Sequence, residues 1–137
     1  MTKRIICEID DTEHAESAII HAAELAARTG APLTLCTVNV MQGGLRGPAT
    51  YLHDGAEIKR MLEDAASLAA RYGARTVSEA ALEAREVADA VVQYAQKNGF
   101  DHIVTSTGDR RGLCRLALGS VAADIAGKAH CTVTIAR

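Results

Sequence analysis

The 137-residue sequence has few aromatic residues and no long hydrophobic run: it holds one Phe, three Tyr and no Trp. So few rings leave little to stack on exposed bases, and a net charge of -2 attracts neither nucleic acid nor an anionic membrane. No apolar run approaches the roughly 18 residues of a membrane helix, and the opening MTKRIICEIDD lacks a signal peptide's apolar core. We therefore expect a cytoplasmic protein without nucleic acid or membrane as partner.

The cysteines also lack the spacing of a known site. Cys7, Cys36, Cys114 and Cys131 form no C-x-x-C pair and have no histidine at ligand spacing, so the sequence predicts no metal site. We expect them to be small buried hydrophobic residues or reduced thiols.

Short β-branched runs alternate with longer amphipathic runs along the whole chain. Strands are predicted at residues 4–9, 33–40, 75–81, 102–106 and 131–136. Helical spacing covers residues 18–26, 58–72, 87–95 and 120–127, and the first three helices should stop at Gly30, Gly73 and Gly99. This alternation predicts one α/β domain over residues 1–137, with a doubly wound five-stranded parallel sheet and four helices.

Two local features complete this outline. Residues 41–53 contain three glycines and Pro48 without periodicity, which predicts a long mobile loop after the second strand. Thr12 is expected to cap the first helix, with Glu13 and Glu16 in its positive first turn.

The candidate site lies where the carboxyl ends of the strands meet. Ligands of doubly wound sheets bind there, beside the point at which the strand order reverses. The end of the first strand, the end of the second near Val38 and the turn after the fourth converge at this place. That turn leads to Gly119-Ser120, a pair whose backbone N–H groups suit a phosphate at a helix start. An ordinary N-cap serine after a turn glycine explains the same pair.

The stretch STGDRRGLCRLALGSVAADIAGKAHCTVTIAR resembles the C-terminal signature of the universal stress protein family, and RIICEIDDTEHAESAIIHAAELAARTGAPLTL resembles its opening. The resemblance covers the whole chain. It implies an adenine-nucleotide α-hydrolase-like domain with strand order 3-2-1-4-5, and in some members ATP binding through G-x2-G-x9-G-[ST]. By this resemblance a nucleotide would contact Asp10, Val38, Ser106, Thr107, Gly119, Ser120 and Val121.

The chain departs from that motif, of which only Gly119-Ser120 is in register. Ser106 and Asp109 stand where its first two glycines belong, and their side chains occupy space that phosphate would need. The Asp109 carboxylate disfavours a triphosphate unless Mg²⁺ or a nearby arginine, such as Arg110, offsets its charge. The alternative is that these arginines belong to a solvated surface.

Glu8 is the second departure. Side chains alternate along a strand, so Glu8 and Asp10 point to the same side, roughly 6–7 Å apart. Two carboxylates in such a place raise the pKa of one or recruit a cation. We hypothesise that Glu8 narrows or re-polarises the pocket and so changes its ligand preference. The alternative is that a neighbouring donor satisfies it.

The last strand carries the partner prediction. Thr132, Val133, Thr134 and Ile135 form a β-branched edge that should pair with the same edge of a second copy, and the resemblance implies the same homodimer. A covered edge in a monomer is the alternative.

Two functions stay open at this point. The favoured one is a dimeric stress-response protein with a degenerate cleft that binds ATP weakly or not at all. The alternative is an adenine-nucleotide sensor that takes ATP, with Mg²⁺, and hydrolyses it slowly at most.

Two other functions fit the sequence less well. A receiver domain would need an aspartate ending the third strand and a lysine ending the fifth, and both are missing. An enzyme would use Glu8 with Asp10, or Ser120 with a histidine, but no nucleophile elbow or histidine motif is present, so no catalytic residue is predicted.

Overall fold

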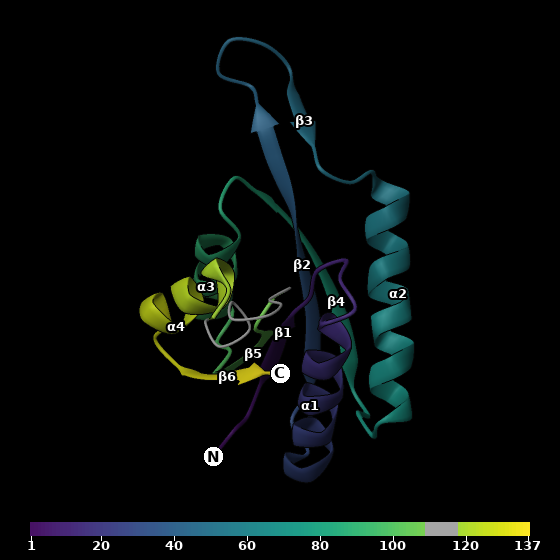
Figure 1. Ribbon diagram of the computed structural model, residues 1–137. Coiled ribbons are helices and arrows are strands. Elements are labelled where there is room, and N and C mark those ends of the chain that lie inside the picture. Colours follow the sequence, from purple (N-terminus) through teal and green to yellow (C-terminus); the bar gives the residue numbers. More distant parts are fainter. Residues whose placement is uncertain (109–117) are drawn as a thin grey trace.

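The computed structural model describes residues 1–108 and 118–137 as a sheet with helices on both faces (Figure 1). In chain order the elements are β1 (Ile5–Glu8), α1 (Ala15–Thr29), β2 (Leu33–Gly43), β3 (Ala49–Tyr51), α2 (Gly55–Arg71), β4 (Val77–Ala84), α3 (Val87–Lys97), β5 (His102–Ser106), α4 (Ser120–Lys128) and β6 (Thr132–Ala136). No helix in these two ranges combines the length and apolar character of a membrane span.

Five strands are parallel and follow the predicted order. β4 pairs with β2, β2 with β1, β1 with β5, and β5 with β6, which is 3-2-1-4-5 when the parallel strands alone are counted. The prediction of five strands was incomplete, because β3 adds a short antiparallel pairing to β2. The strand order reverses at β1, so a crevice forms between the carboxyl ends of β1 and β5.

The two faces of the sheet have separate apolar cores. The α1 and α2 helices cover one face, against Ile5 and Cys7 of β1, and α3 and α4 cover the other, against Ile6 (Figure 1). Cys7 and Cys36 are fully buried, as predicted for small hydrophobic residues, whereas Cys131 is half-buried and Cys114 lies outside the described residues.

The helix ends confirm the predicted stops and correct the predicted start. Gly30, Gly73 and Gly99 follow their helices with φ of 74°, 101° and 72°, which residues with a side chain rarely adopt. The expected Thr12 cap was wrong, because α1 begins at Ala15 and the Thr12 hydroxyl instead donates to the Asp10 carboxylate at 2.6 Å. A capping side chain accepts an N–H of the first helical turn, and the residue in the N-cap position here is His14, which makes no such bond.

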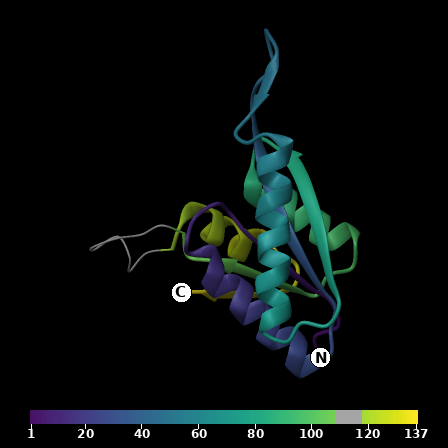
Figure 2. The same ribbon diagram turned by 90° about the vertical axis from the view of Figure 1, so that its right-hand side faces the viewer.

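The prediction of a mobile loop over residues 41–53 was also wrong. β2 continues to Gly43 and the chain returns as β3, forming a hairpin that projects from the body in two perpendicular views (Figure 1, Figure 2). Gly43, the last residue of β2, and Gly44 have φ of 73° and 87° where the chain enters the connection of residues 44–48 between the two strands. The same glycines that indicated a loop therefore belong to a hairpin.

Candidate functional site

A cavity of about 330 Å³ opens where β1 and β5 end beside the start of α4. The structure brings together all seven residues that were predicted to contact a nucleotide: Asp10, Val38, Ser106, Thr107, Gly119, Ser120 and Val121. The crevice at the strand-order reversal is therefore a cavity with walls from β1, β2, β5 and α4.

Gly119 fixes the start of α4 against the end of β5. Its N–H donates to the Thr107 carbonyl oxygen at 2.8 Å, and a Cβ at this position would lie 2.5 Å from the same oxygen. No real Cβ tolerates that distance, so the close approach of the two segments requires a glycine here.

The first turn of α4 presents backbone donors. Its first intrahelical bond runs from the Ala123 N–H to the Gly119 carbonyl, so the N–H groups of the three preceding helical residues have no partner within the helix. This turn contains no acidic residue, and Ser120 and Val121 line the cavity. The positive end of the helix dipole therefore meets the cavity.

Glu8 lies in the wall of the cavity and is 6% exposed. The buried Thr105 hydroxyl donates to its Oε2 at 2.7 Å. Burial raises the pKa of Glu8 to about 7; the Thr105 hydrogen bond opposes this shift and the charge of Asp10 adds to it. Thr105 is therefore the neighbouring donor of the alternative interpretation, and the effect of Glu8 on ligand preference stays a prediction.

Asp10 and Asp11 make the rim acidic. Asp10 Oδ1 accepts hydrogen bonds from both the backbone N–H of Thr12, at 3.0 Å, and the Thr12 hydroxyl. These two bonds hold the loop after β1 in a turn around the Asp10 side chain. Asp11 also lines the cavity, and its side chain is 59% exposed. Among the lining residues in the described part of the chain there is no lysine or arginine. The predicted roles of Asp109 and Arg110 fall outside the described residues.

The hairpin contributes His53 and Leu52, which sequence reasoning missed. The buried Asn39 side chain exchanges two hydrogen bonds with the His53 backbone, at 2.7 and 2.9 Å. The His53 ring then lies 2.9 Å from Glu57 Oε2 and 3.5 Å from Asp11 Oδ2. A polar Asn39 within the strand-like run 33–40 was the available signal, because a buried amide needs partners from a neighbouring segment.

The described part of the cavity offers neither a grouped set of metal ligands nor a Phe, Tyr or Trp ring. Within residues 1–108 and 118–137, no three His, Cys, Asp or Glu side chains are grouped to hold a metal ion. The described lining also has no Phe, Tyr or Trp. A ligand would therefore be held by apolar contacts, by hydroxyl and carboxyl groups, and by the first turn of α4.

Comparison with known proteins gives one family. The model described as "Universal stress protein family" matches residues 1–137. The chain is similar to the solved universal stress protein from Archaeoglobus fulgidus, with 27% identity, 100% coverage of each chain and a TM-score of 0.81. The chain is also similar to an A. fulgidus universal stress protein solved in complex with dAMP, with 27% identity, 98% coverage of each chain and a TM-score of 0.75. A third similar structure is a universal stress protein in complex with cAMP, with 22% identity, coverage of 99% of this chain and 97% of that one, and a TM-score of 0.80. No curated protein matches the chain.

Two glycines of the α4 region offer a matched test of the Gly119 contact. Gly119→Ala places a methyl group against the Thr107 carbonyl, and we expect it to lower the free energy of unfolding by about 1–3 kcal/mol. Gly127→Ala meets nothing within 4 Å, and we expect it to be neutral or to stabilise by up to about 1 kcal/mol. Urea unfolding measures both, and equal effects would show that α4 does not abut Thr107 as described.

Glu8→Gln tests the burial of the carboxyl through pH. The folded protein keeps the Glu8 proton up to about pH 7, whereas the unfolded chain releases it near its ordinary pKa of 4.5. Native stability therefore falls as pH rises between these values, by about 3 kcal/mol in all. Glutamine does not titrate, so the free energy of unfolding of Glu8→Gln, relative to that of wild type, should rise between about pH 5 and about pH 8. A constant difference in urea unfolding would mean that native Glu8 is ionised at both pH values.

Proposed function

The chain belongs to the universal stress protein family, and we propose that its cleft binds an adenine nucleotide and prefers a monophosphate to a triphosphate. The observation that carries this proposal is the positive end of α4 at the cavity, where Gly119 allows the start of the helix to lie against Thr107. A similar protein from A. fulgidus, 27% identical over nearly its whole length, has been solved in complex with dAMP, which supports the ligand class.

The phosphate end of the ligand would lie against α4. Ser120 is exposed and adds a hydroxyl to the backbone donors of the first turn, and the hydroxyls of Ser106 and Thr107 line the same cavity. A phosphate monoester can therefore collect several N–H and O–H donors at once. Its charge also complements the helix dipole.

The carboxylates disfavour additional phosphates. Asp10 and Asp11 line the cavity, and the described lining supplies no lysine or arginine to offset their charges. Each further phosphate adds negative charge near these groups, and like charges at close range oppose binding. We therefore keep the prediction that ATP binds weakly or not at all.

We assign the cleft to binding rather than catalysis. A serine nucleophile needs a base within hydrogen-bond reach, and His53 is the histidine that lines the described cavity. Both of its ring nitrogens already face carboxylates, those of Glu57 and Asp11. This arrangement favours a structural role for His53 over activation of Ser120.

Isothermal titration calorimetry with AMP, adenosine and ATP, each with and without Mg²⁺, tests the proposed function. We expect AMP to bind at least about tenfold more tightly than ATP, a difference of about 1.4 kcal/mol. Gly119→Ala should weaken AMP binding while leaving adenosine binding nearly unchanged, because it disturbs the phosphate end, and Gly127→Ala should behave as wild type. Tighter binding of ATP than of AMP would contradict the preference, and no binding of either would contradict the function.

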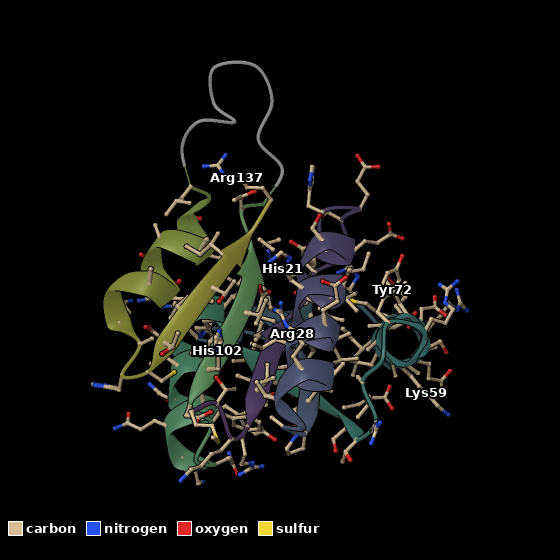
Figure 3. The ribbon with its side chains drawn as sticks, turned by 90° about the horizontal axis from the view of Figure 1, so that it is seen from below. His21, Arg28, Lys59, Tyr72, His102 and Arg137 are labelled. Atoms are coloured by element: carbon tan, nitrogen blue, oxygen red, sulfur yellow. The ribbon has the colours of Figure 1, made fainter. Side chains whose placement is uncertain are left out.

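We further propose that two copies pair through β6. In the described chain β6 pairs with β5 on one side and with no strand on the other, and Figure 3 shows it along the outside of the sheet. His102 Nε2 and Thr134 Oγ1, 2.7 Å apart, fix β6 on β5, while Ile135 is half-exposed and packs in neither core. A twofold contact would pair both free edges and cover Ile135.

Sedimentation equilibrium tests this dimer. Ile135→Asp should place two charges near the twofold axis and shift the protein toward monomer by at least about tenfold in dissociation constant. Leu45→Asp is the matched control, because Leu45 is 89% exposed at the hairpin tip and far from β6 in the fold (Figure 1). A monomeric wild type, or a dimer lost only in the Leu45 variant, would contradict pairing through β6.

A further inference from the structure

The Glu8 carboxyl has hydrogen-bonding capacity that residues 1–108 and 118–137 leave unused. Among the described residues the Thr105 hydroxyl is the donor that reaches it, and this bond occupies Oε2. A carboxylate can accept about four hydrogen bonds, so a side chain that is 94% buried with one donor has room for a donor from a ligand. Because Glu8 lines the cavity, that donor can come from a bound molecule.

Glu8 lies deeper than the phosphate end of the cavity. Thr105 precedes Thr107 by two residues on β5, roughly 6–7 Å along the strand, and Thr107 is the residue that contacts the start of α4. On the other side of β1, Glu8 is in register with Cys36, and Val38 lies one strand repeat further on. The Glu8–Thr105 pair therefore forms a polar floor below the proposed phosphate end, beside an apolar wall.

We propose that Glu8 is the specificity-determining residue of the cleft: in the ionised form, the oxygen that Thr105 leaves free accepts an N–H of the 6-amino group of the bound base, so a base with an amino group at that edge is preferred. This inference rests on the proposed function, because it requires a nucleotide in the cleft. In the absence of lining Phe, Tyr or Trp among the described residues, such a hydrogen bond separates bases that apolar contacts would treat alike.

The protonation state of Glu8 decides whether its free oxygen donates a hydrogen bond to the ligand or accepts one. Since Oε2 accepts from Thr105, the acid proton of neutral Glu8 falls on the other oxygen, which then offers an O–H to the ligand. The ionised form can only accept. Because burial raises the pKa of Glu8 to about 7, both forms are accessible near neutrality. A 6-amino purine should be favoured above that pH, and a 6-oxo purine should gain below it.

Other titratable groups near Glu8 have to be separated from it. They are Cys7 and Asp10 on and after β1, Cys36 on β2, and Asp11 and His53 at the rim; the described lining residues of β5, α3 and α4 carry no charge. Burial raises the pKa of Cys36 to about 12 and that of Cys7 well above its usual range, so both thiols stay neutral near pH 7. Any pH dependence from the remaining groups persists when Glu8 is replaced.

Calorimetric titration with AMP and IMP tests the assignment, because AMP has an amino group at position 6 beside an unprotonated N1, whereas IMP has a carbonyl oxygen there beside an N1–H. At about pH 8, wild type should bind AMP at least about tenfold more tightly than IMP, and this ratio should shrink as pH falls to about 6. In Glu8→Gln the amide oxygen can keep the Thr105 bond and the amide N–H₂ faces the ligand. The ratio should therefore fall to one or below and no longer change with pH.

Glu24→Gln is the control, because it makes the same Glu-to-Gln change on the exposed surface of α1, outside the cavity lining, and it should keep the wild-type ratio and its pH dependence. Equal binding of AMP and IMP by wild type, or an unchanged ratio in Glu8→Gln, would overturn the role of Glu8 and leave the proposed function standing. Binding of neither nucleotide would overturn both.

Discussion

A single hydrogen bond between neighbouring parallel strands, from the Thr105 hydroxyl to the Glu8 carboxyl, sets the character of this molecule's cleft. All four residues of β1 are buried, and a strand in that position is normally apolar throughout. The carboxyl is tolerated because Thr105 supplies a donor and because burial favours its neutral form. The place where the strand order reverses thus has a polar, titratable floor instead of an apolar one.

The β5 strand connects this floor to the mouth of the cavity. Thr105 faces Glu8, and two residues later the Thr107 carbonyl accepts the N–H of Gly119, so one short strand positions both the buried carboxyl and the start of α4. The hairpin closes the third side through the paired hydrogen bonds of Asn39 and His53. An anionic group suits the α4 end and a neutral, hydrogen-bonding group suits the floor, which is the polarity of a nucleoside monophosphate.

Much of this arrangement follows from local patterns, and the exceptions have physical reasons. The alternation of β-branched and amphipathic runs predicted the parallel strands and the helices between them, and the family resemblance implied the strand order. Strand ends that must meet at one sheet edge predicted the grouping of Asp10, Ser106 and Ser120. The hairpin was missed because Gly43 and Gly44 favour a loop and a turn equally, and only the pairing with β3 distinguishes them. Thr105 was not identified as the partner of Glu8, because that bond depends on which strands become neighbours rather than on spacing along the chain.

Native Glu8 keeps its proton up to about neutrality, and its side-chain carboxyl carbon reports this directly. A pH titration by ¹³C NMR, with the Glu8 signal identified by its loss in Glu8→Gln, gives the midpoint for this one group. The structure predicts a midpoint near 7, well above the ordinary value of 4.5. A midpoint near 4.5 would show that the carboxyl is ionised and solvated, and the account of a buried, titratable floor would be wrong.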